Sequence, residues 1–98
     1  MTDPHATLRD EVFRRAFDGP GESEPALRRA AAENVAVPSD LQQLVNKIHA
    51  HAYRVTDEDI ARGLTQYDDD KLFEIIVSAA LGASRTRLLA GLAALEDA

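Results

Sequence analysis

The sequence predicts an all-α protein of five or six helices joined by short connections. Apolar residues recur at helical spacing along most of the 98 residues, whereas Val, Ile and Thr are too scattered for a sheet. The apolar share is 45%, yet the chain has no Trp and only five Phe and Tyr residues, so Ala and Leu must fill the core. Small side chains suit closely packed helices, and a chain of this length forms a single domain.

The first third of the chain is expected to form a helical lead over residues 7–34. "TLRDEVFRRAF", residues 7–17, has apolar residues three and four positions apart. "DGPGESE" then interrupts the pattern, because Gly and Pro both resist helix continuation. "SEPALRRAAAEN", residues 23–34, restarts it, with Ser23 as the expected N-cap and a proline in the first turn.

Residues 39–97 are expected to form a compact helical unit. Ser39 is the predicted cap of its first helix, whose apolar residues fall within about 80° of a helical wheel: Leu41, Leu44, Val45, Ile48, Ala52 and Val55. Thr56 is the expected cap of a short helix with acids in its first turn, which suits the helix dipole. Asp68 or Asp69 is expected to cap a long final helix.

The most apolar stretch is "FEIIVSAALGASRTRLLAGLAAL", residues 73–95. A membrane-spanning helix needs about 20 apolar residues, but only ten residues separate Glu74 from Arg85, and Arg87 follows. We therefore expect a soluble helix. From Leu72 to Ala83 the helix is apolar nearly all round, so it should lie at the centre of the unit or of a dimer interface.

Within this stretch the apolar direction turns. Leu88, Leu92 and Leu95 fall on the side of the wheel that Glu74 and Arg85 occupy. Either the helix kinks near "GAS", residues 82–84, or its two halves pack against different neighbours. Arg87 falls on the apolar side, so we expect it either to be paired, with helix-end carbonyls or a carboxylate, or to reach the rim, because a lone buried charge costs several kcal/mol.

Charge and composition narrow the partners and cofactors. The net charge of −6 makes nucleic acid an unsuitable partner and gives no attraction to anionic lipid. With no cysteine, the chain has no disulfide, thiolate catalyst or thiolate metal site. Its first residues are polar and show no signal peptide, so we expect a cytoplasmic protein with no cofactor and no metal.

"VTDEDIARGLTQYDDDKLFEIIVSAALGASRTRLLAGL" resembles the C-terminal part of AhpD-like proteins, the carboxymuconolactone decarboxylase superfamily. The shared features are a short helix capped by acids, an Asp-rich turn, and a long helix in which a Glu is followed thirteen residues later by an Arg before Leu. Here these are Glu74, Arg87 and Leu88. The resemblance covers about residues 39–95. It implies a compact helical AhpD-like domain and a homodimer or higher homo-oligomer.

The chain departs from that family at the catalytic motifs. Peroxidase-type members carry a CxxC with a histidine four residues later, and this chain has no Cys. Decarboxylase members carry an acid and a histidine on one helix, and no His lies near residues 87–91. The leading hypothesis is therefore an oligomeric binding or assembly module without thiol peroxidase activity, with a cysteine-bearing AhpD-like relative as a candidate partner. The alternatives are a decarboxylase-like enzyme and, less favoured, a ligand sensor with an apolar pocket.

The decarboxylase-like alternative would transfer protons on a small carbonyl or lactone substrate through Glu74 and a histidine such as His49. If Glu74 is buried beside Ser78, desolvation raises its pKa and makes it a general base; if it lies at the rim beside Lys71, it is a solvated acid. His49 and His51 point about 200° apart on a helix, so they do not chelate one metal within the chain.

The remaining candidates for a binding site lie on two helices. Ser78 and Arg87 belong to the long last helix, and the others belong to the helix that begins at Ser39. Asn46, His49 and Tyr53 share one face at helical spacing. They line either a polar pocket or the half-exposed edge of an amphipathic helix. The acidic run at residues 68–70 lacks the spacing and closing Glu of a calcium loop, and helix capping explains it better.

Overall fold

The computed structural model describes residues 6–97, and in this range it contains helices and no strand, which confirms the all-α prediction. The elements are α1 (Ala6–Asp18), α2 (Pro25–Glu33), α3 (Ser39–His51), the 3-10 turn η1 (Ala52–Arg54), α4 (Asp57–Leu64) and α5 (Asp69–Asp97).

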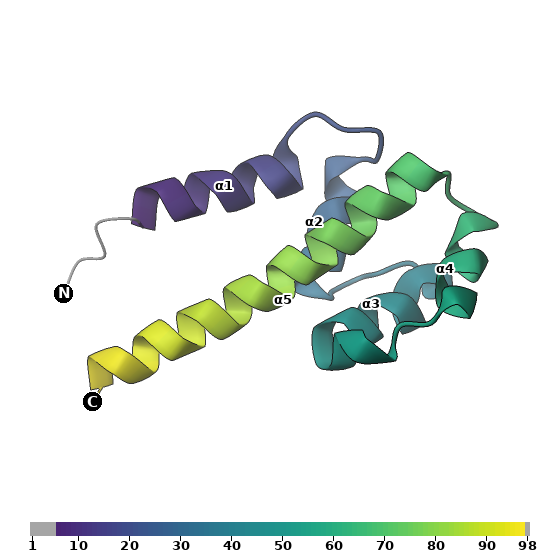
Figure 1. The fold of residues 1–98 in the computed structure, drawn as a ribbon. Coiled ribbons are helices and arrows are strands. Elements are labelled where there is room, and N and C mark those ends of the chain that lie inside the picture. The colour runs from purple at the N-terminus through teal and green to yellow at the C-terminus, as the bar shows by residue number, and fades with distance from the viewer. Residues whose placement is uncertain (1–5, 98) are drawn as a thin grey trace.

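Helix α5 is the axis around which the other helices are arranged (Figure 1). Its 29 residues span about 43 Å, most of the 47 Å length of the molecule. Helices α2, α3 and α4 pack against its first half, and α1 lies beside α2. The last turns of α5 extend beyond these neighbours, so one helix has a covered half and an open half (Figure 1).

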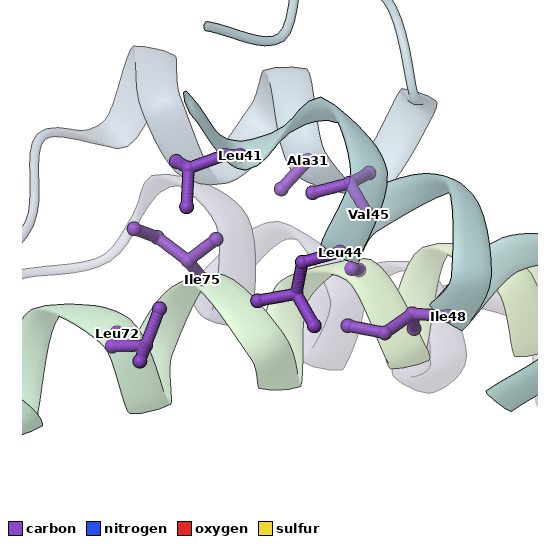
Figure 2. Close-up of a cluster of buried hydrophobic side chains, with 8 residues drawn as sticks. Ala31, Leu41, Leu44, Val45, Ile48, Leu72 and Ile75 are labelled. Carbon is purple, nitrogen blue, oxygen red and sulfur yellow. The ribbon is translucent and has the colours of Figure 1, made fainter. Parts of the chain in front are cut away.

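The core lies between α2, α3 and the first half of α5 (Figure 2). It consists of Ala31, Leu41, Leu44, Val45, Ile48, Leu72, Ile75 and Ala79. The apolar stripes predicted for the third and last helices thus meet each other. Helix α2, from the predicted lead, contributes Ala31 to the same core.

The third helix is shorter than the apolar stripe predicts. It ends at His51, and the turn η1 follows, so Ala52 is exposed rather than part of the buried face. Val55, beyond the turn, is half-buried and packs against the core from the connection to α4.

Helices α2 and α5 approach each other closely at Gly82. A Cβ built on Gly82 would lie 2.0 Å from the carbonyl oxygen of Ala32, far inside van der Waals contact. The absence of a side chain therefore lets the two backbones touch, which is the common reason for a glycine inside a buried helix.

Two of the predicted helix caps are confirmed. Thr56 Oγ1 accepts from the Asp59 amide at 3.2 Å, and Asp59 Oδ2 accepts from the Thr56 amide at 2.9 Å, which is a capping box. Asp68 Oδ1 accepts from the amide of Lys71 at 2.9 Å, at the start of α5.

Two other predicted caps are wrong. The N-cap of α2 is Glu24, because the Ser23 side chain is bonded to α5 instead. The N-cap of α3 is Pro38, with Ser39 already helical, and no side chain caps it. The helix start is set here by the proline, whose φ of −53° suits helix entry.

Helix α5 runs unbroken from Asp69 to Asp97, so the kink proposed at residues 82–84 is not formed. The two halves instead differ in burial. Ala79 is fully buried in the first half, whereas Leu88 is 42% and Leu95 is 74% exposed in the second. The turn of the apolar direction thus marks the point where α5 leaves the core.

Candidate functional site

Glu74 binds the connection between α1 and α2. Its Oε1 accepts from the Ser23 amide at 2.9 Å and the Ser23 hydroxyl at 2.7 Å, and its Oε2 accepts from the Glu22 amide at 2.8 Å. The Ser23 hydroxyl, followed by these two backbone amides, lowers the pKa of Glu74 to about 2. The carboxyl group is therefore ionised at neutral pH.

This environment suits a structural clamp better than a general base. A general base at neutral pH needs a raised pKa, and every strong contact of Glu74 acts in the opposite direction. Both carboxylate oxygens also accept hydrogen bonds from Glu22 and Ser23, and these bonds attach the connection between α1 and α2 to α5.

Arg28 completes this cluster, and the sequence reasoning did not identify it. Its side chain is 4% exposed; Nη1 donates to Ala16 O at 3.0 Å, Nη2 donates to Gly19 O, and Nε lies 4.0 Å from Glu74 Oε1. The guanidinium thus satisfies carbonyls at the C-terminal end of α1, which have no partners within the helix. The doublet Arg28–Arg29 in the sequence carries no signal that one arginine is buried and its neighbour exposed.

His49 and Arg87 lie at a junction of three helices. His49 Nε2 donates to the Ala31 carbonyl at 2.7 Å, since a carbonyl can only accept. Arg87 Nη2 donates to the backbone carbonyl of His49 at 2.7 Å. The expectation that Arg87 binds helix-end carbonyls is confirmed, and this junction links α2, α3 and α5.

The other predicted site residues do not gather around one cavity. Asn46 Oδ1 accepts from Asn34 and Gln42, each at 2.9 Å, on the outer side of α3. Tyr53 belongs to η1 and is 80% exposed, so it no longer follows the helical face that would bring it beside Asn46. Ser78 is 2% exposed on the core side of α5.

Two hollows on the surface are candidate ligand sites. A cleft of about 430 Å³ is lined by Glu22, Ser23, Glu24, Leu27, Gln66, Tyr67, Asp68 and Lys71. An apolar groove of about 300 Å³ between α4 and α5 is lined by Ile60, Leu64, Asp69, Leu72, Phe73 and Ile76. The Ser23 hydroxyl in the cleft is bonded to Glu74, whose lowered pKa makes it a poor base, and the lining of the groove includes no hydroxyl, thiol or amine side chain. Within residues 6–97, no group of His, Asp and Glu side chains is arranged to hold a metal ion.

An uncharged and mostly apolar surface lies on the side of α5 that faces away from the core. We call it the outer seam, and its residues are Phe73, Val77, Ala80, Ser84, Leu88, Gly91 and Leu95. Their spacing of three or four places them on one helical face about 33 Å long. None is charged, and Phe73 and Leu95 are 67% and 74% exposed. The sequence analysis named two of these residues, Leu88 and Leu95, but not the continuation of the seam back to Phe73.

Helix α5 is also long and apolar enough to cross a membrane, judged by length and composition alone. The same helix supplies Leu72, Ile75 and Ala79 to the core shared with α2 and α3. Burial in the core thus explains why the first half of α5 is apolar on the side facing α2 and α3. It does not explain the apolar residues of the outer seam.

No family model, no curated protein and no solved structure matches the chain. The resemblance to AhpD-like proteins stays a prediction from the sequence.

Proposed function

We propose that the protein is a self-assembling helical module whose copies associate through the outer seam of α5. One observation carries the proposal: α5 is apolar nearly all round from Leu72 to Ala83, and Leu88 and Leu95 continue one apolar face into a second half that lies open. Single exposed leucines are common on protein surfaces, whereas a contiguous apolar stripe indicates an interaction surface.

Electrostatic attraction does not drive this association, and the seam itself presents no charge that would oppose it. The chain carries −6, so a second copy is repelled at long range. The seam has no ionisable residue, and burying it removes no charge from water. Association therefore rests on apolar contact, and salt should not weaken it.

An AhpD-like ancestry and a cysteine-bearing relative as a second partner belong to the same proposal. The absence of cysteine supports a role without thiol peroxidase chemistry in these 98 residues. The cytoplasmic location stays a prediction. The decarboxylase-like alternative has no supporting geometry, because Glu74 binds Ser23 while the His49 ring binds Ala31.

The test is sedimentation velocity from about 1 to 300 µM, comparing Leu88→Gln with its neighbour Leu89→Gln. Both leucines are 42% exposed on the same helix, but only Leu88 lies in the seam. Burying the exposed part of Leu88 in both copies is worth about 1.5 kcal/mol, so its loss should weaken self-association roughly tenfold. Gln preserves helix propensity, so both variants should stay folded.

The expected result is self-association of the native chain, weakened in Leu88→Gln and retained in Leu89→Gln. A native chain that stays monomeric across the whole range would overturn the proposal. Equal weakening in both variants would place the contact elsewhere on α5.

A further inference from the structure

We infer that two copies pair with their α5 helices antiparallel, with the two-fold axis passing beside Ser84. This inference rests on the proposed self-association and adds its geometry. Three observations lead to it: the sizes of the seam residues, their spacing along the helix, and the open space above Gly91.

Side-chain sizes along the seam are complementary about Ser84. In an antiparallel pair with that centre, residues at equal distances before and after Ser84 face each other. Ala80 of one copy then meets Leu88 of the other, and Val77 meets Gly91. Large faces small at both positions, which is how facing helices interdigitate without voids.

The ends and the centre of the seam fit the same arrangement. Phe73 meets Leu95, an aromatic–aliphatic contact between two large seam residues that are 67% and 74% exposed. At the centre, Ser84 meets Ser84 of the second copy, where two small hydroxyl side chains allow close approach and a mutual hydrogen bond. A two-fold interface uses the same surface on both copies, as this pairing requires.

The spacing of the seam keeps it facing the partner over its whole length. The intervals between seam residues repeat after eleven residues, from Phe73 to Ser84 and from Ser84 to Leu95. An eleven-residue repeat gives about 3.67 residues per turn, close to the 3.6 of a straight α-helix. The two helices can therefore stay in contact over about 33 Å with little supercoiling.

A parallel pair fits these residues less well. Each residue would then face its own copy, so Leu88 would meet Leu88 while Gly91 met Gly91. Two facing leucines hold the helices apart, so a void is left between the two facing glycines, and the atoms that line a void lose packing contacts. The antiparallel arrangement also sets the positive end of each helix dipole beside the negative end of the other.

The structure has room for the facing side chains. A Cβ built on Gly91 meets no other atom within 4 Å, so the site opposite Val77 is open.

Disulfide cross-linking of single introduced cysteines can test this geometry, because the chain contains no cysteine of its own. We would oxidise Ser84→Cys under mild conditions at a concentration where the native chain self-associates, and analyse the products on a non-reducing gel. Val35→Cys is the control, since Val35 is 62% exposed and lies outside the outer seam, in the connection that follows α2. A disulfide needs Cα atoms about 4.4–6.8 Å apart, which only residues that face each other across the paired helices provide. Ser84→Cys should cross-link at least about tenfold faster than Val35→Cys.

The ends of the seam distinguish the two directions. A mixture of Phe73→Cys and Leu95→Cys should form a disulfide that joins the two variants. Leu95→Cys alone should cross-link no faster than Val35→Cys. Fast cross-linking of Leu95→Cys with itself would overturn the antiparallel pairing in favour of a parallel one. Slow cross-linking of Ser84→Cys in a chain that sediments as a dimer would overturn the position of the axis but leave self-association standing. A chain that sediments as a monomer would overturn both proposals.

Discussion

Replacing Gly82 by alanine tests the closest contact in the fold. The added Cβ would lie 2.0 Å from the Ala32 carbonyl oxygen, whereas ordinary contact begins near 3.4 Å, so α2 must move by more than 1 Å. Inserting a methyl into a packed contact costs about 1–3 kcal/mol, and a backbone neighbour gives way less easily than a side chain. Alanine regains up to about 1 kcal/mol of helix propensity.

We therefore expect Gly82→Ala to lower the free energy of unfolding by about 1–2 kcal/mol. For a domain of this size the melting temperature should fall by roughly 5–15 °C. Gly91→Ala is the matched control: it makes the same substitution in the same helix, but its Cβ meets nothing within 4 Å. This control should gain about 0.5–1 kcal/mol from helix propensity.

Thermal unfolding followed by circular dichroism measures both effects. It should be done at low micromolar concentration, so that pairing through Gly91 does not contribute. Opposite shifts are expected for the two variants. A Gly82→Ala protein as stable as Gly91→Ala would refute the close approach of α2 and α5, and with it the reason for a glycine at this position.

Three further outcomes are expected. The Glu74 pKa is lowered to about 2, so the contribution of its carboxylate to stability is complete above pH about 4.5 and is lost as the pH falls towards 2. In urea unfolding, Glu74→Gln should therefore have a lower free energy of unfolding than the native chain at pH 7, and this difference should shrink at pH 3. A difference that stays constant would contradict the clamp. Thr56→Ala removes one side of the capping box and should cost about 1 kcal/mol, whereas an unchanged urea midpoint would show that the cap is dispensable. Self-association should strengthen between 0.05 and 0.5 M NaCl, because salt screens the repulsion between two chains of charge −6, and weakening by salt would indicate ion pairs across the interface instead.

Periodicity predicted the helices because burial of one helical face is a local property of the sequence. The stripe of Leu41, Leu44, Val45 and Ile48 is buried as expected, and Thr56 caps α4 with Asp59. The end of α3 at His51 was not predicted. The apolar spacing continues to Val55, and only the path of the chain into α4 decides that Val55 packs from a turn.

The site residues were less predictable, since their roles depend on contacts distant in sequence. Glu74 was singled out as the one acid inside the apolar helix, but its partner Ser23 lies 51 residues away and looked like a helix cap. Arg28 showed no pattern at all, because a buried arginine differs from an exposed one only in the carbonyls that it meets.

By itself the sequence determined that these 98 residues are helical and acidic and contain no cysteine, and that the last helix is apolar nearly all round from Leu72 to Ala83. Only the tertiary structure decided how that helix is used. Neighbouring helices cover its first half, and Glu74 is taken up by a loop clamp. The outer seam, from Phe73 to Leu95, is left open. The physical reason is that a helical pattern specifies which side chains share a face, whereas the number and lengths of the packed neighbours specify which faces are covered.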